Sequence, residues 1–312
     1  MRLTRTRLVS VGLVAAFVAA FFALGAVSRS SATPAGITAA NAVPYVPWYW
    51  TMVVSPNDPN AVVLGTSNGL YRSADGAKTW KQVGPQGVNM TSVVVAGTAM
   101  FAGGVPGPNP VIRTKTGRTA PNGPGVLAES TDGGQKWRLL HPAGLPSVTV
   151  QALAADPAKS TTLYALLNNG RLYRSTDGAR SFALVTTKVG ISPWALAVTQ
   201  GDHFVGGDMD NGGFASTNGK SWQRTAFKDS RGGRMVMEYA VQPDDASVVL
   251  MSSVGIERST DGGKTWQLAL NSPVMFGPVA FAPKQTQVAY AIGFDRSFWR
   301  SDDGGKTWKK VS

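Results

Sequence analysis

The acidic side chains that could take part in catalysis lie in segments that we expect to gather at one face of the molecule. They are Asp208, Asp210, Asp229, Glu238 and Asp295. Two carboxyl groups at a suitable separation are enough to hydrolyse a glycosidic bond, one acting as acid and the other as base or nucleophile. Aspartates in loops are more commonly solvated surface groups. These five carboxylates are therefore the catalytic candidates for a hydrolase, and solvation in a surface loop is the alternative for each.

The sequence contains few residues that could support other catalytic chemistries. The chain has no cysteine, which excludes a disulfide, a thiol nucleophile and a thiolate metal site. Its two histidines, His141 and His203, stand in no metal-binding or triad motif. Residues 208–212 begin like a calcium loop, but Gly219 occupies the position where the closing glutamate would stand. We therefore expect no metal site and no cofactor.

Basic and aromatic side chains offer a binding surface. The candidates are Arg113, Lys115, Arg118, Trp194, Arg231 and Arg234. The first three lie in the Pro/Gly-rich stretch 103–125, which holds no carboxylate, and Trp194 could stack on a sugar ring or on a partner side chain. The formal net charge of +12 would attract an acidic partner. The chain has no long Lys/Arg run, so we expect no nucleic acid partner.

The first residues have the pattern of an export segment. Three arginines between Met1 and Arg7 precede an apolar run from Leu8 to Val27, which is the order found in signal peptides. The run is also long enough to span a bilayer, so an uncleaved anchor is the alternative. We expect residues 1–32 to be a signal peptide or signal anchor and residues 33–42 a linker. The remainder is then extracytoplasmic, either secreted or held at the membrane through residues 8–27.

One short motif recurs six times after this segment. Its copies begin at Ser73, Ser130, Ser175, Ser216, Ser259 and Ser301, and their third positions are Asp75, Asp132, Asp177, Asn218, Asp261 and Asp303. Five copies end in tryptophan and one ends in Phe182. The serines lie 57, 45, 41, 43 and 42 residues apart. A period in the low forties is the length of a four-stranded propeller blade.

Each copy lies between two strand-like runs and therefore predicts a hairpin turn. The Asp or Asn side chain can accept hydrogen bonds from backbone amides across the turn, and the glycine after it supplies a positive φ. The hydroxyls of the motif close the remaining polar groups, while the aromatic residue covers the turn. The fourth copy is one residue shorter and uses Asn218, so we expect its turn to differ.

These motifs resemble the Asp boxes, or bacterial neuraminidase repeats, of sialidases, xyloglucanases, sortilin-type receptors and photosystem II assembly factors. The resemblance covers residues 43–312. It implies an all-β chain that folds as a sialidase-like, six-bladed β-propeller of four-stranded antiparallel blades. In those families the Asp boxes are structural and lie away from the active face. The families do unrelated things, so the resemblance implies the fold and leaves the function open.

Antiparallel order then assigns the loops to two faces. The Asp boxes and the turns between first and second strands share the lower face, whereas loops between second and third strands and links between blades share the upper face. The candidate carboxylates, the stretch 103–125 and Trp194 all belong to the upper face. We expect the last two blades to use residues 235–241, 248–253, 256–259 and 265–270, then 274–282, 287–292, 297–300 and 307–311, as strands.

A sialidase-type active site is incomplete in this sequence. The family's first arginine stands ahead of blade one, where this chain reads Val43 to Trp48 with no arginine. The family's nucleophile is a tyrosine activated by a glutamate. Glu238 precedes Tyr239 here, but neighbouring residues of a strand point to opposite faces. These departures put a sialidase activity in doubt.

The sequence favours a non-catalytic binding or assembly module, exported and monomeric, whose upper face recognises a protein or glycan partner. The photosystem II assembly factors are the nearest parallel by repeat type, although members of that family usually have seven blades. The alternative is a glycoside hydrolase of sialidase or xyloglucanase type that uses carboxylates of the upper face.

Overall fold

The computed structural model describes Pro44 and residues 46–107, 112–114, 117–119, 124–189, 194–199, 203–208, 210–227 and 232–311. The described residues belong to one compact unit, Ala39–Ser312, called unit 2 below. The predicted export segment 1–32 and the predicted linker 33–42 lie outside the described residues. In the described part of the chain, no helix is long and apolar enough to cross a membrane.

The described chain is built from strands. Four antiparallel blades have four strands each. Blade one contains β1 (Tyr49–Val54), β2 (Val62–Thr66), β3 (Gly69–Ser73) and β4 (Lys81–Val83). Blade two contains β5 (Val88–Ala96), β6 (Ala99–Pro106), β9 (Val126–Ser130) and β10 (Arg138–Leu139). Blade three contains β11 (Val150–Ala155), β12 (Leu163–Leu167), β13 (Leu172–Ser175) and β14 (Ala183–Thr186), and blade four contains β15 (Ala195–Thr199), β16 (His203–Asp208), β17 (Gly212–Ser216) and β18 (Gln223–Arg224).

The last third of the chain forms one six-stranded antiparallel sheet, called the C-terminal sheet below. Its strands are β19 (Glu238–Gln242), β20 (Asp245–Ser259), β21 (Gln267–Phe281), β22 (Ala289–Gly293), β23 (Phe298–Ser301) and β24 (Lys309–Lys310). A separate hairpin, β7 (Ile112–Thr114) and β8 (Gly117–Thr119), lies in the loop between β6 and β9.

The prediction of six separate blades was therefore wrong: four blades are separate, and the last two boxes share the C-terminal sheet. The cause lies in two strands of 15 residues, β20 and β21, each of which covers two of the predicted strands. Gly255 takes a φ of 101° inside β20, where one register shift falls between Val254 and Ile256 and another between Ile256 and Glu257. The predicted link between the last blades is strand instead, because Met275 pairs with Val254.

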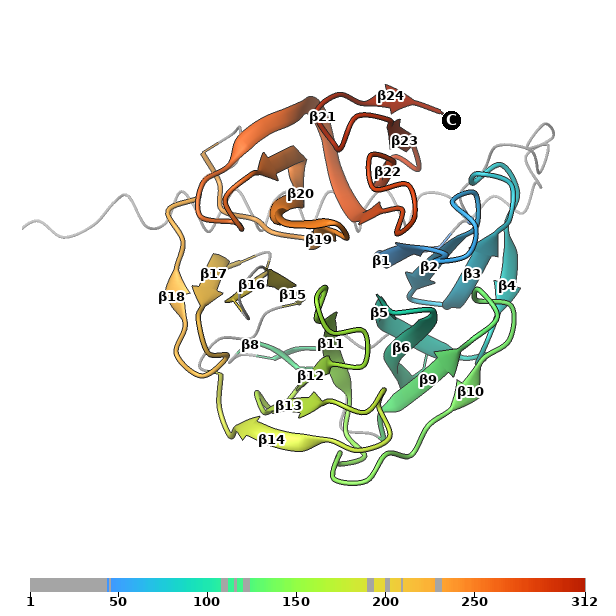
Figure 1. Ribbon diagram of the computed structural model, residues 1–312, viewed down its shortest axis with the longest axis vertical. Coiled ribbons are helices and arrows are strands. Elements are labelled where there is room, and N and C mark those ends of the chain that lie inside the picture. Colours follow the sequence, from blue (N-terminus) through green and yellow to red (C-terminus); the bar gives the residue numbers. More distant parts are fainter. Residues whose placement is uncertain are drawn as a thin grey trace, which may run out of the picture. The chain divides into compact units, whose positions relative to one another are not determined.

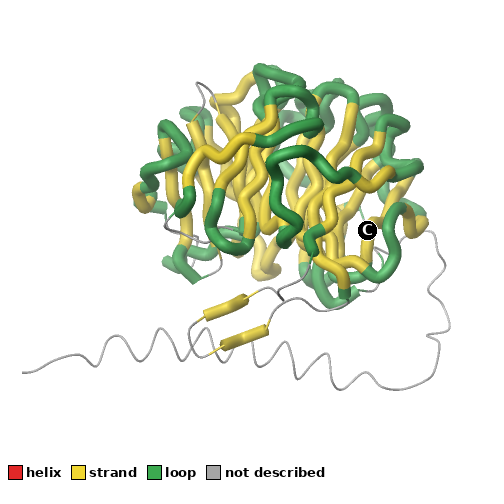
Figure 2. The backbone as a smooth tube through the Cα atoms, turned by 90° about the horizontal axis from the view of Figure 1, so that it is seen from below, coloured by secondary structure: helices red, strands yellow, loops and turns green. Residues whose placement is uncertain are grey.

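The sheets surround a common centre in unit 2 (Figure 1), with β1, β5, β11, β15 and β19 on the inside of the ring. Seen after a 90° turn (Figure 2), the strands run between two faces where the loops gather. Second strands such as β2 and β12 are buried at every residue, as expected for strands covered on both faces. The inner strand of each sheet is the one that reaches the centre, so residues at its ends can meet residues of distant blades.

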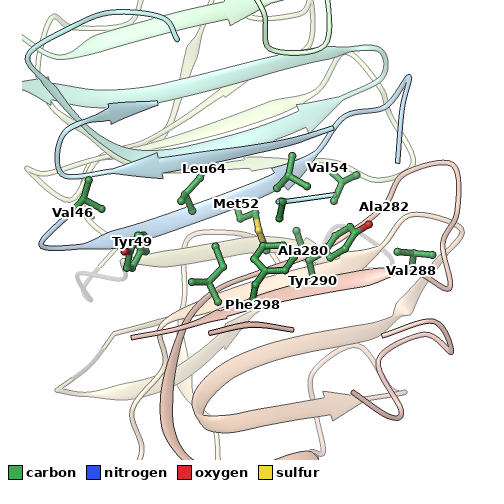
Figure 3. Close-up of a cluster of buried hydrophobic side chains, with 13 residues drawn as sticks. Val46, Tyr49, Met52, Val54, Leu64, Ala280, Ala282, Val288, Tyr290 and Phe298 are labelled. Carbon is green, nitrogen blue, oxygen red and sulfur yellow. The ribbon is translucent and has the colours of Figure 1, made fainter. Parts of the chain in front are cut away.

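Ring closure depends on an apolar cluster between blade one and the C-terminal sheet (Figure 3). It joins Met52, Val54 and Leu64 to Tyr290 and Phe298, all nearly inaccessible to solvent. Trp80 of the first Asp box lies edge-on to Phe298, with ring centroids 6.3 Å apart. No strand is exchanged between the two sheets, so burial of apolar surface closes the ring.

The Asp boxes are hairpin turns built as predicted. In the fifth box, Asp261 Oδ1 accepts the backbone N–H groups of Lys264 and Thr265, each at 2.9 Å, and Oδ2 accepts the Thr265 hydroxyl at 2.6 Å. The Ser259 hydroxyl donates to Oδ1 at 2.7 Å and accepts the N–H of Gly263 at 2.9 Å. One carboxylate and one hydroxyl thus satisfy most polar groups of the turn.

The boxes lie on the same face as the turns that precede the second strands. Backbone N–H groups of Gly76, Gly178, Gly262 and Gly304 donate to the carbonyl oxygens of Asn60, Thr161, Ser247 and Gln287 at 2.8–2.9 Å. The acceptors stand one or two residues before a second strand or, in β20, within its first residues. This arrangement confirms the assignment of the boxes to the lower face.

The fourth box differs locally, as its shorter sequence predicted. Asn218 Oδ1 accepts the N–H groups of Lys220 and Ser221 at 2.8 and 2.9 Å. An amide has a single acceptor oxygen, so the second carboxylate oxygen of the other boxes has no counterpart here. The deleted residue also changes the contact with the preceding blade.

Arginines just before three of the boxes show the consequence of that deletion. Arg72 Nε donates to the Gly133 carbonyl of the next box at 2.8 Å, and Arg258 Nε donates to Gly304 in the same way at 2.8 Å. Arg174 precedes the third box in the same way, but the fourth box lacks the residue equivalent to Gly133 and Gly304. The buried Nε of Arg174 has no hydrogen-bond partner, and its guanidinium lies over the Tyr164 ring at 5.8 Å. Leaving a buried donor unsatisfied costs free energy.

We expect Asp261→Ala to lower the free energy of unfolding by about 1–3 kcal/mol, because several N–H and O–H donors lose their acceptor. Asp261→Asn is the matched control. It keeps one acceptor oxygen, as Asn218 does naturally, and should cost less than alanine. Denaturant unfolding of the three proteins measures both losses. Equal stability of the alanine variant and the parent would show that the turn is held by other contacts.

We expect Arg72→Met to cost about 1.5–3 kcal/mol, because the Gly133 carbonyl loses a charged donor while the apolar stem is kept. Arg174→Met removes an unsatisfied donor and should change stability by no more than about 0.5 kcal/mol. Thermal or denaturant melts of the pair test the difference. A larger loss at position 174 than at position 72 would contradict this account.

Candidate functional site

Four aromatic rings form a continuous array at the upper end of the inner strands; we call them the aromatic array. Trp48 stacks on Trp50 with centroids 5.6 Å apart, and Trp50 stacks on Trp194 at 5.5 Å. Phe294 lies edge-on to Trp48 at 5.8 Å. All four side chains are partly exposed. Stacked and edge-on rings at these separations attract one another beyond their burial alone.

The array crosses the ring. Trp50 belongs to β1, whereas Trp194 directly precedes β15, and these inner strands lie on opposite sides of the centre in Figure 1. Their indoles nonetheless stack with an interplanar angle of 27°. The two tryptophans therefore meet over the upper mouth of the central channel.

Backbone hydrogen bonds fix the residues of the array. Trp194 N–H donates to the Gly207 carbonyl at 2.8 Å, and Phe294 N–H donates to the Met275 carbonyl at 2.9 Å. The backbone N–H of Trp48 donates to the Ser67 hydroxyl at 3.3 Å, and the backbone N–H of Ser67 donates to the Trp48 carbonyl at 3.1 Å. Rings held on anchored backbone lose little freedom when a ligand stacks on them.

The inner strands enclose a central channel of about 370 Å³. Its upper end is lined by Trp50 and Trp194, and its lower end by Asp156, Pro157 and Pro283. Most of the wall between them is apolar. A space of this size lies within the range of small-ligand sites.

Glu238 places a carboxyl group in this channel. Its Oε1 lies 2.6 Å from the Thr51 hydroxyl of blade one, and its Oε2 accepts the N–H of Val279 at 3.2 Å. The N–H of Met52 also bonds to the carboxyl group. One side chain from β19 thus satisfies polar groups on the inner edges of β1 and β21.

Burial raises the pKa of Glu238 well above its ordinary value, and the bonds from Thr51, Val279 and Met52 oppose that shift only in part. Within the described residues, no lysine or arginine forms an ion pair with it. The other acid of the channel, Asp156, is paired with Lys159 at 3.2 Å. Glu238 is therefore a carboxyl group of the channel whose charge no described cation balances.

Glu238 and Tyr239 point away from each other, as strand geometry predicted. The Tyr239 hydroxyl lies 3.5 Å from the Gly206 carbonyl oxygen, whereas Glu238 reaches Thr51. Burial, with a smaller contribution from Asp208, raises the pKa of Tyr239. A tyrosine that resists ionisation and faces away from the glutamate is unsuited to the nucleophile role.

Two other catalytic candidates, Asp208 and Asp295, are engaged in their own turns, whereas Asp210 is exposed just after β16. Asp208 Oδ1 accepts the N–H groups of Asp210 and Asn211, and Oδ2 accepts the Asn211 side-chain amide at 2.9 Å. Asp295 Oδ1 accepts the N–H of Ser297 at 3.0 Å and also its hydroxyl. Asp229 lies outside the described residues. Among the residues that are described, no group of three or more His, Asp or Glu side chains could hold a metal ion.

The binding candidates are brought together only in part. Trp194 joins the aromatic array, and Arg234 is exposed beside the loop after Asp208, because a Cβ at Gly212 would meet the Arg234 carbonyl oxygen at 2.6 Å. The side chains of Arg113, Lys115, Arg118 and Arg231 lie outside the described part of the structure. Their role in binding stays a prediction.

Sequence reasoning missed three members of the array and the channel partner of Glu238. The sequence alone assigned no binding role to Trp48, Trp50, Phe294 or Thr51. The alternation Trp48-Tyr49-Trp50 was an available signal, because residues two apart on a strand share a face. The stacking of Trp50 on Trp194 joins residues 144 positions apart, and no local pattern announces it.

The fold and its repeated turn define a β-propeller with four-stranded antiparallel blades. A family model described as BNR/Asp-box repeat matches residues 257–268 and 299–310, which are the last two boxes. The chain is therefore an Asp-box β-propeller.

Comparison with known proteins finds relatives of more than one kind. The oligoxyloglucan reducing end-specific xyloglucanase of Emericella nidulans is 26% identical over 235 residues, which are 67% of this chain and 28% of that protein. Among solved structures, the GH74 xyloglucanase from Xanthomonas campestris superimposes with a TM-score of 0.51 at 18% identity, covering 88% of this chain and 46% of that one. At this identity the likeness shows the fold alone.

A second solved structure, YCF48 bound to D1 peptide, superimposes with a TM-score of 0.49 at 19% identity and covers 86% of either chain. A TM-score of 0.49 is too low for this likeness to bear on function. The chain spans little more than a quarter of the length of the curated xyloglucanase it matches, so its own activity must be argued from its residues.

The raised pKa of Glu238 predicts a pH-dependent stability. A group whose pKa is higher in the folded state favours folding below its unfolded pKa, and that contribution is lost as the pH rises through the folded pKa. Glu238→Gln mimics the protonated acid, since its amide can donate to Thr51 and accept from Val279. We expect the variant to gain stability over the parent as the pH rises above about 4.5.

Denaturant unfolding at pH 4, 6 and 8 measures the difference between Glu238→Gln and the parent. Glu129→Gln, at a glutamate that is 17% exposed and paired with Arg138, is the matched control for the loss of one carboxylate. Parallel stability profiles for Glu238→Gln and the parent would contradict the assignment of an unbalanced interior carboxyl group.

Proposed function

We propose that this chain is an exported, non-catalytic binding module whose upper face captures a protein or glycan partner. The observation that carries the proposal is the aromatic array of Trp48, Trp50, Trp194 and Phe294. Anchored aromatic rings at the mouth of a propeller channel supply contact area at little cost in conformational entropy. Aromatic residues of this kind dominate the affinity of many interfaces.

The carboxylates support a binding role over hydrolysis. Asp208 and Asp295 accept hydrogen bonds from their own loops, and Glu238 is committed to Thr51 and Val279. A glycosidase needs two carboxyl groups that flank the scissile bond, with at least one free to exchange a proton with substrate. The described residues favour turn formation for these aspartates.

Exposed cations add an electrostatic component. Arg171, Lys188 and Arg234 are exposed in loops of the upper face. Together with the basic residues of the stretch 103–125 they would speed the approach of an acidic partner, and the effect would fade as salt rises. We therefore place the partner-binding surface at the aromatic array and extend it toward these cations.

Hydrolysis of a glycan remains the second candidate, favoured by the 26% identity to a xyloglucanase. Stacked indoles also suit the flat faces of sugar rings. Turnover of xyloglucan oligosaccharides by the purified protein, lost on Asp210→Asn, would move the assignment to this second candidate.

We expect Trp48→Ala and Trp194→Ala each to weaken partner binding at least about tenfold, which corresponds to about 1.4 kcal/mol. Ligands would come from panning a peptide library and from a panel of xyloglucan oligosaccharides, followed by calorimetry. Leu139→Ala is the matched control, because Leu139 is equally apolar and 51% exposed on the outer strand β10. Wild-type affinity in both tryptophan variants would rule out the array as the binding surface.

A further inference from the structure

The channel below the aromatic array contains a group that the proposed function does not use. Glu238 lines the channel, where it is partly accessible to solvent, and the described residues offer it no ion pair. An ionised carboxylate without a cation is costly in such surroundings. Titratable groups with perturbed environments that face a cavity are candidates for ligand binding.

The carboxyl group has room for one more partner. An ionised carboxylate offers about four lone-pair positions. The Thr51 hydroxyl and the N–H groups of Val279 and Met52 occupy three of them. All three donors are neutral, so the charge itself stays unbalanced while a position for a further donor is left.

The walls suit the apolar part of a small ligand. Leu153, Leu196 and Val198 line the channel, and the stacked indoles of Trp50 and Trp194 cover its upper end. Trp50 directly precedes Thr51, whose hydroxyl bonds to Glu238, so the carboxyl group lies near the indole end of the channel. Low-polarity surroundings strengthen the attraction of a carboxylate to a cation.

We propose that the central channel binds a small organic cation, an alkylammonium or guanidinium group, whose charge pairs with Glu238 and whose carbon chain lies against the apolar wall. The cation is either that of a free amine or the tip of a Lys or Arg side chain from a partner. This site is distinct from the upper face, because Trp48 and Phe294 do not line the channel.

Binding of a cation ionises Glu238 and therefore releases a proton where the free acid is protonated. The other titratable groups of the channel do not obscure this signal. Asp156 is paired with Lys159 at the lower end, and the Tyr239 hydroxyl turns toward Gly206. A proton released on binding thus reports on Glu238.

Calorimetric titration with n-butylammonium, set against 1-butanol as the neutral isostere, tests the site. We expect n-butylammonium to bind at least tenfold more tightly than 1-butanol. Repeating the titration near pH 5 in buffers of different ionisation enthalpy should show proton release. Equal binding of the alcohol and the amine, or no binding of either, overturns the proposal without any variant having to fold.

Variants locate the cation. We expect Glu238→Gln to weaken n-butylammonium binding at least tenfold, whereas Leu139→Ala on the outer strand β10 leaves it unchanged. Failure of the parent protein to bind n-butylammonium therefore contradicts only the channel site, and wild-type partner binding in both tryptophan variants, Trp48→Ala and Trp194→Ala, contradicts only the proposed function. Unchanged amine binding in Glu238→Gln overturns the channel site.

The source of the cation is distinguished with a blocked tripeptide, acetyl-Gly-Lys-Gly-amide, and its ε-acetylated form. Binding of the free-lysine peptide alone, at an affinity similar to that of n-butylammonium, supports a partner's side chain as the occupant. Binding of n-butylammonium without the peptide supports a free amine. Binding of the ε-acetylated peptide as tightly as the free-lysine peptide overturns the requirement for charge.

Discussion

The structure depends first on the carboxylate of each Asp box, which accepts hydrogen bonds from the N–H and O–H groups of a tight turn. In the first box, Asp75 accepts two backbone N–H groups and two hydroxyls at 2.6–3.0 Å. The turn so formed packs against the preceding blade: a Cβ at Gly134 would come within 2.5 Å of the Val63 side chain, and one at Gly305 within 2.5 Å of Leu250. A satisfied turn is what allows neighbouring blades to approach this closely, and the ring follows from repeating that contact.

Most of the fold could be predicted because its rules are local. The box spacing gave the blade length, and antiparallel order gave the lower face, which the bond from Gly76 to Asn60 confirms. The number of separate blades could not be predicted in the same way. That number depends on whether the residues between two blades form strand pairs or interrupt the sheet. The pairing of Met275 with Val254 turned an expected link into strand. Such pairings are set by tertiary contacts that override local preference.

The candidate site was predicted less well, because its parts come from distant segments. Trp194 was expected near the channel mouth and lies there, but its stacking on Trp50 depends on two inner strands that are not neighbours in the ring. Glu238 was weighed as a general acid; the structure shows instead a carboxyl group bonded to the inner edges of two other strands. These residues meet only when the ring closes, and the sequence of a single blade does not indicate which residues of other blades it will contact.

The two kinds of carboxyl group respond to pH in opposite directions. Burial raises the pKa of Asp303, but the hydrogen bonds from Thr307 and Ser301 outweigh it and hold the pKa at about 2. Its stabilising contribution is present above an aspartate's ordinary pKa and is lost as the pH falls toward 2. The contribution of Glu238 is present at low pH and is lost as the pH rises. Ionisation of the box carboxylates thus favours the fold above their ordinary pKa, whereas ionisation of Glu238 opposes it as the pH rises. A position that costs stability without serving the turn network is the expected signature of a functional group.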